Sequence, residues 1–189
     1  ISTIAESVPI AINDLQGLAD FAKKNSIGLT VVGPELPLTL GIVDIFEEHG
    51  LKIFGPTKEA SEIEGSKSFA KQFMQKYHIP TASFRIFQNH TEAIDFVATA
   101  RYPLVIKADG LAAGKGAVIA ENFDEARSTV ENIMVQKVFG EAGAKLVVEE
   151  FLTGEEITVM ALTDGERVIP MVAAQDHKRI FDNDQGPNT

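Results

Sequence analysis

The sequence predicts an α/β fold. Short apolar runs typical of buried strands alternate with segments of helical periodicity, Gly, Pro or Asn residues separate them, and 44% of the 189 residues are hydrophobic. Strands that alternate with helices are typical of an α/β architecture. The hydrophobic content is enough for a packed core, and the length allows one large domain or two small ones.

Two pairs of a helix and a strand are predicted at the N-terminal end. A helical pattern at residues 15–22 precedes an apolar run at residues 29–32, and a second helical pattern at residues 40–49 precedes a short strand at residues 52–54. Apolar runs without alternation are typical of strands covered on both faces by helices. This order predicts the end of a doubly wound unit.

A longer helix is predicted from Glu59 to Tyr77. Its apolar side chains fall on adjacent helical stripes, and Pro80 ends it. A sheet with its own helices begins after this residue, so we expect a domain boundary near Pro80.

The rest of the chain alternates strands and helices around glycine loops. Asn122, followed three residues later by Glu125, is typical of a helix N-cap, and Asp164 with Gly165 favours a tight hairpin. We expect helices at residues 91–100 and 123–135, and strands at residues 83–87, 104–108, 117–120, 146–151, 157–162 and 168–173.

Charge and composition argue against several functional classes. Seventeen Lys and Arg against 27 Asp and Glu give a net charge of −10, which repels a phosphodiester backbone. The absence of cysteine excludes disulfides and thiolate sites, and it fits a reducing cytoplasm. No apolar run reaches the roughly 20 residues that span a bilayer, and no export signal is evident. We expect a soluble cytoplasmic protein without nucleic-acid or membrane partners.

The strongest local signal is the sequence KADGLAAGKG at residues 107–116. Closely spaced glycines let backbone N–H groups wrap phosphate oxygens. The loop differs from a P-loop because only three residues separate Gly110 from Gly114, Gly116 stands where Ser or Thr should bind magnesium, and a strand follows. Taken alone, it is either a phosphate clamp or a hairpin turn that needs glycine.

Lysines favour the phosphate clamp. Lys107 lies in an otherwise apolar strand, where an unpaired ammonium is costly, so an anionic ligand such as a nucleotide phosphate would explain it. Lys115 at the loop tip could equally be solvated. Lys67 lies beside an apolar helical stripe and could reach out to water instead of binding phosphate.

Two acidic pairs follow. Glu149 and Glu150 end a buried strand, and Glu155 and Glu156 come directly after Gly154. Such pairs are usually solvated surface. A strand that leaves a sheet also exposes backbone groups that can read an adenine edge, while a nearby carboxylate can hold ribose hydroxyls.

Together these features resemble the nucleotide site of the ATP-grasp superfamily. In that superfamily two lysines contact the α and β phosphates, matching Lys67 and Lys107, the hinge that pairs with adenine matches residues 149–152, and a ribose-binding carboxylate matches Glu156. The resemblance implies ATP binding by Lys67, Lys107, Gly110, Leu111, Ala112, Ala113, Gly114, Lys115, Gly116, Glu149, Glu150, Phe151, Leu152 and Glu156.

Within the superfamily, an ordered set of motifs resembles the glycinamide ribonucleotide synthetase family from about residue 27 to residue 189. The motifs are VGPELPL at residues 32–38, FGPT at 54–57, EGSK at 64–67, KADGLAAGKG at 107–116, QDHKR at 175–179 and GPNT at 186–189. Each motif is weak alone, and the ordered set is specific.

That resemblance implies ligation of glycine to 5-phosphoribosylamine through a glycyl phosphate, with ATP and Mg²⁺ or Mn²⁺, by a monomer or weak dimer. No catalytic residue is assigned, because the chemistry does not require His177 as a base. Residues 176–179 could equally be an ordinary exposed cluster, and Glu35 could cap a helix. The implied substrate-binding residues are Gly33, Pro34, Glu35, Asp176, Lys178, Asn188 and Thr189.

The resemblance also implies a domain order. Residues 1–62 would be part of an N-terminal pre-ATP-grasp domain, 63–80 a linking helix, 81–162 the smaller nucleotide-binding subdomain, and 163–189 the start of the larger one. The chain starts at Ile1 rather than Met and ends on a turn-like sequence. We expect a fragment that binds nucleotide without catalysing, with its metal ligands beyond Thr189. Another ATP-grasp carboxylate–amine ligase and a non-catalytic nucleotide-binding module stay as alternatives.

Overall fold

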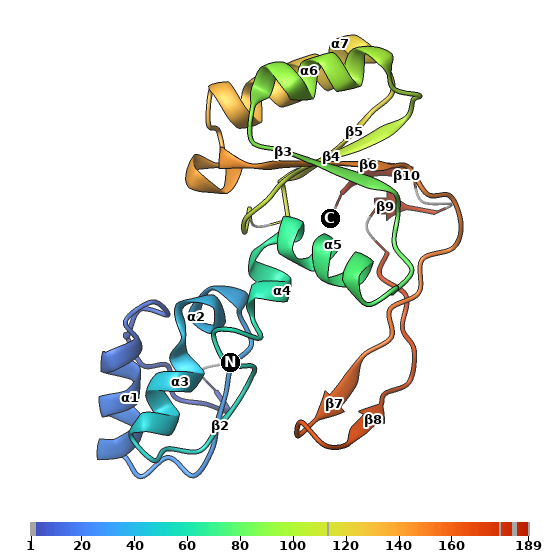
Figure 1. Ribbon diagram of the computed structural model, residues 1–189. Helices are drawn as coiled ribbons and strands as arrows, with labels where there is room; N and C mark the ends of the chain where they lie inside the picture. The colour runs from blue at the N-terminus through green and yellow to red at the C-terminus, as the bar shows by residue number, and fades with distance from the viewer. Residues whose placement is uncertain (1–2, 113, 178, 183–184, 189) are drawn as a thin grey trace. The chain divides into compact units, whose positions relative to one another are not determined.

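The computed structural model describes residues 3–112, 114–177, 179–182 and 185–188. The chain forms two compact units, Ile1–Phe151 and Leu152–Thr189, each of which is described by itself (Figure 1). Both helices and strands are present, so the predicted α/β class is confirmed at this level.

The N-terminal part of the first unit contains two parallel strands and three helices. The strands are β1 (Thr30–Val31) and β2 (Ile53–Phe54), and α1 (Leu15–Lys24) and α3 (Ile42–Glu48) pack around a core that includes Ala19, Val43 and Phe46. The second helix was expected at residues 40–49. It is instead divided, because Gly41 adopts a left-handed φ of 96° and separates α2 (Glu35–Leu40) from α3.

The single helix expected from Glu59 to Tyr77 is wrong in one respect that matters for the site. It is broken into α4 (Glu62–Gly65) and α5 (Lys67–Lys76). Ser66 between them is extended, with φ −136° and ψ 112°, and its side chain caps α5 by accepting a hydrogen bond from Phe69 N. The break makes Lys67 the first residue of a helix.

A four-stranded antiparallel sheet forms the centre of the first unit, in the order β3 (Phe84–Phe87), β6 (Leu146–Glu150), β4 (Leu104–Ala108) and β5 (Ala117–Ala120). On one face, α6 (His90–Thr99) and α7 (Phe123–Val130) cover a core made of alternating apolar strand residues. Helix α5 lies on the other face (Figure 1). The sheet therefore offers one face to the core and one to α5.

Helix α7 begins as expected and ends earlier than expected. Asn122 accepts a hydrogen bond from Glu125 N at 3.0 Å, which confirms the predicted N-cap. The helix expected at residues 123–135 is regular only to Val130 and continues as a π-helical turn, η1 (Glu131–Val135). A 3₁₀ segment, η2 (Gly140–Ala144), then leads into β6.

The second unit contains two antiparallel pairs. The hairpin of β7 (Ala161–Thr163) and β8 (Val168–Pro170) is shorter than the strands expected at residues 157–162 and 168–173, and an isolated bridge between Thr158 and Ala174 extends it. Strands β9 (Arg179–Phe181) and β10 (Gln185–Asn188) form the other pair. Across the described part of the chain, no helix is long and apolar enough to cross a membrane.

Candidate functional site

The register of β4 against β6 places a lysine and a glutamate side by side. Lys107 is paired with Val147, and Val105 is paired with Glu149. Paired residues share a face of an antiparallel sheet, and so do residues two apart, which makes Lys107 and Glu149 diagonal neighbours on the face covered by α5. Their neighbours Ile106 and Val148 point to the opposite face and into the core.

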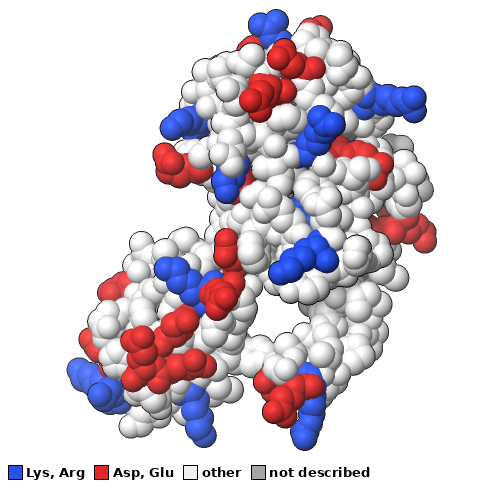
Figure 2. Space-filling model, in the orientation of Figure 1, with Lys and Arg blue, Asp and Glu red and all other residues white. Residues whose placement is uncertain are grey.

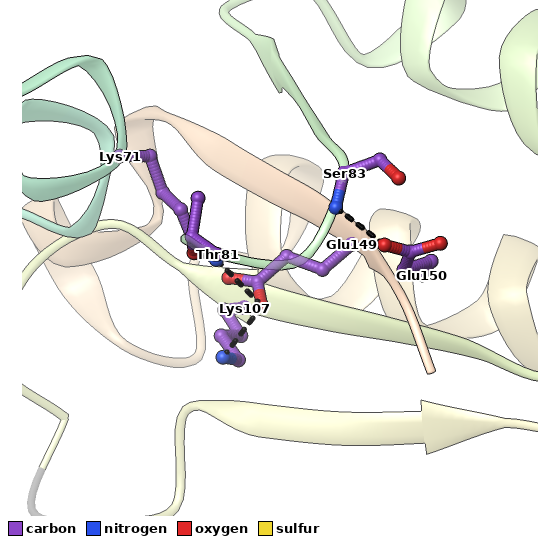
Figure 3. Close-up of polar contacts among 6 residues, drawn as sticks. All are labelled: Lys71, Thr81, Ser83, Lys107, Glu149 and Glu150. Carbon is purple, nitrogen blue, oxygen red and sulfur yellow. Dashed lines mark hydrogen bonds and ion pairs between the residues drawn. The ribbon is translucent and has the colours of Figure 1, made fainter. Parts of the chain in front are cut away.

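Helix α5 brings a second lysine to the same glutamate. Lys71 Nζ lies 3.1 Å from Glu149 Oε2, and Lys107 Nζ lies 3.0 Å from the same oxygen. Lys71 also donates a hydrogen bond of 2.7 Å to Thr81 Oγ1. Figure 3 shows the two lysines reaching the carboxylate of Glu149 from different elements. We call Lys71, Lys107 and Glu149 the lysine–glutamate cluster.

The lysine–glutamate cluster is unequal in burial and in charge. The side chains of Glu149 and Lys71 are 6% and 10% exposed, whereas that of Lys107 is 28% exposed. Two ammonium groups share one carboxylate, so the cluster carries an excess positive charge. Glu149 Oε1 is buried and has no hydrogen-bond partner among the described residues. Buried polar atoms usually have a partner, so this oxygen is suited to a donor from a ligand.

The start of α5 is tied to the end of β4. Lys67 N donates to Asp109 O at 2.9 Å, and Lys67 Nζ donates to Gly110 O at 3.0 Å. The carboxylate of Asp109 in turn accepts hydrogen bonds from Ser68 N at 2.6 Å and from Ser66 Oγ at 3.2 Å. A carboxylate at a helix N-terminus is favourable because it satisfies free N–H groups and complements the helix dipole. These bonds hold Lys67 beside the glycine loop.

Burial has an electrostatic effect on Lys67. Desolvation lowers its pKa from the ordinary 10.5, and nearby Lys107 lowers it further, while Glu64, Asp109 and Glu149 raise it. Desolvation is the largest cause, so the net effect is a pKa below the ordinary value. An anion bound beside Lys67 would reverse that effect.

The glycine loop between β4 and β5 is closed by backbone bonds. Ala108 N donates to Gly116 O at 2.8 Å, and Lys115 N donates to Ala112 O at 2.9 Å. Gly114 has a left-handed φ of 74°, which favours glycine. At Gly116, an added Cβ would lie 2.5 Å from Ala112 Cβ. The loop therefore connects β4 and β5 as a hairpin, as one of the two interpretations predicted. A hairpin loop of this kind can also bind phosphate, so the phosphate clamp stays a prediction.

Comparison with protein families decides the relationship. Residues 65–189 match the model described as "Phosphoribosylglycinamide synthetase, ATP-grasp (A) domain", and residues 1–64 match "Phosphoribosylglycinamide synthetase, N domain". The chain belongs to the phosphoribosylglycinamide synthetase family. The resemblance inferred from the ordered motifs is thus confirmed.

Curated relatives of this chain include phosphoribosylamine–glycine ligases. A phosphoribosylamine–glycine ligase of Halalkalibacterium halodurans is 56% identical over 100% of this chain and 44% of its own length. One of Clostridium acetobutylicum is 51% identical over 95% of this chain and 43% of its own length. The chain spans less than half the length of these curated relatives.

Solved structures show the same fold. A phosphoribosylamine–glycine ligase of Thermotoga maritima is 38% identical, with a TM-score of 0.68 over 73% of this chain and 35% of its own. The biotin carboxylase domain of a Hydrogenobacter thermophilus 2-oxoglutarate carboxylase, in complex with MgADP, is 20% identical, with a TM-score of 0.75 over 94% of this chain and 41% of its own. At that identity, the second comparison shows the fold alone.

The structure brings four of the predicted ATP-binding residues into contact in pairs. Lys67 contacts Gly110, and Lys107 contacts Glu149. Lys107 was expected to need an anionic ligand as its counter-charge. Glu149 supplies a carboxylate within the chain, so Lys107 is not unpaired without a ligand. Leu111 and Ala112 are partly buried, Lys115 is exposed, and Ala113 lies outside the described residues.

The predicted hinge runs across the end of the first unit. Glu150 accepts a hydrogen bond from Ser83 N at 2.8 Å, and that bond lowers the pKa of its carboxyl (Figure 3). Phe151 is 38% exposed at the end of the unit. Leu152 and Glu156 are exposed and belong to the second unit. Of the residues predicted to form the adenine-binding hinge, Glu149, Glu150 and Phe151 therefore belong to the first unit.

The predicted substrate residues lie elsewhere. Gly33 and Pro34 line an apolar cleft of about 440 Å³, and Glu35 is exposed as the first residue of α2, with Pro34 rather than Glu35 at the N-cap. In the second unit, Asp176 is exposed and Asn188 lies in β10. The remaining predicted substrate residues, Lys178 and Thr189, lie outside the described residues.

Two residues of the site were missed in the sequence. Lys71 was not singled out, and Asp109 was named only as part of the glycine-rich motif at residues 107–116. A spacing of four residues from Lys67 could have placed Lys71 on the same helical stripe. Its contact with Glu149 depends on the register of distant strands, which no local pattern contains.

On the face drawn in Figure 2, acidic side chains gather over the part that contains α1 to α3, with basic side chains at its edges, and both kinds occur over the rest of the face. The part of the chain that the structure describes contains no group of three His, Cys, Asp or Glu side chains that could hold a metal ion.

Proposed function

We propose that this chain carries the nucleotide-binding part of a ligase that joins glycine to 5-phosphoribosylamine with ATP, in de novo purine biosynthesis. Membership of the phosphoribosylglycinamide synthetase family supports this proposal, as do relatives at 50% identity or more that are named phosphoribosylamine–glycine ligase. The chain covers 44% of the H. halodurans relative, so the complete reaction is proposed for an enzyme that contains this chain.

The proposed chemistry has two steps. An oxygen of the glycine carboxylate attacks the γ-phosphorus of ATP, which forms glycyl phosphate and releases ADP. The amine of 5-phosphoribosylamine then attacks the acyl carbon, so a C–N bond forms, the C–O bond to phosphate breaks, and glycinamide ribonucleotide and phosphate result. A carboxylate is a poor electrophile before the first step. The protein contributes mainly by positioning the reactants and offsetting charge.

The observation that carries the nucleotide site is the convergence of three lysines, Lys67, Lys71 and Lys107, beside the glycine loop. Lys71 and Lys107 share a single oxygen of Glu149, and Lys67 reaches the carbonyl of Gly110. Phosphates bind where ammonium groups and backbone N–H groups converge. In the proposed site, Lys67 and Lys107 contact phosphates, and the loop of residues 110–116 closes over them.

The buried face of the site is suited to the base or ribose of a nucleotide. Glu149 Oε1 lacks a donor among the described residues. An adenine amino group or a ribose hydroxyl would supply one, and would remove the cost of a buried unsatisfied carboxylate oxygen. The backbone that leaves the sheet after Glu150 is proposed to bind the base edge.

Mg²⁺ or Mn²⁺ is proposed to accompany ATP, as Mg²⁺ accompanies ADP in the H. thermophilus structure. The described residues contain no group of three potential metal ligands, so they do not by themselves make a metal site, and no step is assigned through the ion. Leu152, Glu156 and the substrate residues named from the sequence keep the roles that the resemblance implies.

The finer organisation is also proposed. The segments are 1–62, 63–80, 81–162 and 163–189, and the meeting of the two family models between residues 64 and 65 supports the first division. The net charge of −10 supports a protein without nucleic-acid partners. We propose a cytoplasmic monomer or weak dimer that has no membrane partner.

For the 189-residue chain alone, we propose nucleotide binding without turnover. The chain covers less than half of its relatives, so groups needed for catalysis are expected outside it. The test supplies ATP, Mg²⁺, glycine and 5-phosphoribosylamine and measures glycine-dependent formation of ADP. We expect none above the rate without protein. Glycine-dependent turnover by this chain would contradict the proposal.

The lowered pKa of Lys67 predicts a pH dependence of nucleotide affinity. Phosphate favours the charged ammonium of Lys67. The affinity for ADP should therefore be highest below the pKa of Lys67 in the free site, and it should fall as the pH rises through that pKa. Because burial places that pKa below 10.5, the fall should begin at lower pH than an exposed lysine would give. Arginine stays charged, so Lys67→Arg should move the fall to higher pH. Calorimetric titration with ADP between about pH 7 and about pH 10 measures it, and identical profiles for both proteins would contradict the assignment.

A further inference from the structure

Lys71 is a buried lysine for which the proposed nucleotide contacts have no use. It is 8% exposed, yet its ammonium group is satisfied by Glu149 Oε2 and Thr81 Oγ1 and lies 5.7 Å from the centre of the Phe84 ring. Burying a lysine is costly unless it is fully partnered. The partners of Lys71 come from the strand β6 and from the segment before β3, so the arrangement is fixed by the sheet.

The two lysines of the lysine–glutamate cluster differ in their freedom to move. Lys71 has a second acceptor in Thr81 and is nearly enclosed, whereas the side chain of Lys107 is 28% exposed. Lys107 can therefore turn towards an anion at the surface of the site. Lys71 cannot follow without losing both of its partners.

Without Lys71, that movement would leave a buried charge. Among the described residues, Lys107 would then be the one ion-pair partner left to Glu149, whose side chain is 6% exposed. A phosphate would have to compete with this carboxylate for Lys107. Phosphate binding would leave the carboxylate of Glu149 buried without a counter-charge, which is costly in the low dielectric of the interior. With Lys71 in place, Glu149 stays compensated while Lys107 changes partner.

We propose that Lys71 is a positioning residue, which keeps Glu149 compensated and oriented so that Lys107 can leave it for a nucleotide phosphate. The inference rests on the proposed nucleotide site. Lys71 itself does not touch the nucleotide. Its second effect is on Glu149 Oε1, because a carboxylate held through Oε2 presents its other oxygen in a fixed direction.

A double-mutant cycle tests this inference on ADP affinity, measured by calorimetry on the whole chain. Lys71→Met is expected to weaken binding about tenfold, and Lys71→Arg to restore most of that loss. In a Glu149→Gln background, Lys71→Met should change affinity by less than about twofold, since there is no charge left to compensate. Lys76→Met is the matched control, because Lys76 is an exposed lysine of the same helix. Circular dichroism confirms that each variant is folded.

A measurement on the wild-type chain covers the case in which a variant does not fold. The NMR signals of the lysine Cε groups are followed as ADP is added. We expect the Lys107 signal to move and that of Lys71 to stay, because only Lys107 changes partner. Equal movement of both signals would overturn the inference.

The outcomes separate the two proposals. A wild-type chain that does not bind ADP contradicts the proposed nucleotide site, and the inference falls with it. If the wild-type chain binds ADP, the inference alone is overturned by unchanged affinity in Lys71→Met, or by effects of Lys71→Met and Glu149→Gln that simply multiply. If the role of Lys71 were purely structural, the effects of Lys71→Met and Glu149→Gln on ADP affinity would multiply, and Lys71→Arg would not restore the affinity.

Discussion

Glu149→Gln is expected to lower the free energy of unfolding by about 3 kcal/mol. Glutamine keeps the shape of the side chain and removes its charge. Lys71, with a side chain 10% exposed, would then be a buried ammonium without an ion-pair partner among the described residues. Lys107 is less affected because it reaches solvent. Urea denaturation followed by circular dichroism measures the change.

Two variants control this prediction. Glu131→Gln removes the carboxylate of an exposed pair with Arg127, at 2.9 Å, and should cost less than about 1 kcal/mol. Adding Lys71→Met to Glu149→Gln removes the stranded charge and should recover part of the lost stability. Equal losses in Glu149→Gln and Glu131→Gln would show that Glu149 does not compensate a buried charge.

Gly110→Ala is expected to lower the free energy of unfolding by about 2 kcal/mol and to weaken nucleotide binding. A Cβ at this position would lie 2.9 Å from Ala142 Cβ and 3.0 Å from Ala142 Cα. Because the second atom belongs to the backbone, the end of β4 and η2 must move apart. That movement strains the bond from Gly110 N to Ala142 O and displaces the carbonyl that Lys67 contacts.

Gly28→Ala is the control for the loss of a glycine. No atom lies within 4 Å of a Cβ added at Gly28, which is in the segment between α1 and β1. Its stability should stay within about 0.5 kcal/mol of wild type, or rise because alanine restricts the unfolded chain. Chemical denaturation and ADP titration of both variants make the comparison. If Gly110→Ala behaves like Gly28→Ala, close approach at Gly110 is not required.

Much of the sheet could be predicted because its signals are local. The strands expected at residues 104–108 and 117–120 match β4 and β5, since short apolar segments are bounded by the glycine loop. The cap at Asn122 depends only on a side chain and a backbone N–H three residues away. Local chemistry of this kind is present in the sequence before folding.

The charge arrangement could not be predicted because it depends on distant contacts. Lys107 was expected to need a ligand, but the register of β4 against β6 brings Glu149 to it. Lys71 is buried only because α5 lies on that same face. The break at Ser66 was also missed, since its cap with Phe69 is reinforced by the carboxylate of Asp109 from the end of β4.

Calorimetric titration of ADP into the wild-type chain and into Lys107→Met tests the central claim most directly. We predict saturable binding to the wild-type chain and an affinity at least about tenfold weaker in Lys107→Met, because a charge contact with phosphate is lost. Lys24→Met, in the last turn of α1, should bind as the wild-type chain does. An unchanged affinity in Lys107→Met would remove Lys107 from the site and contradict the account.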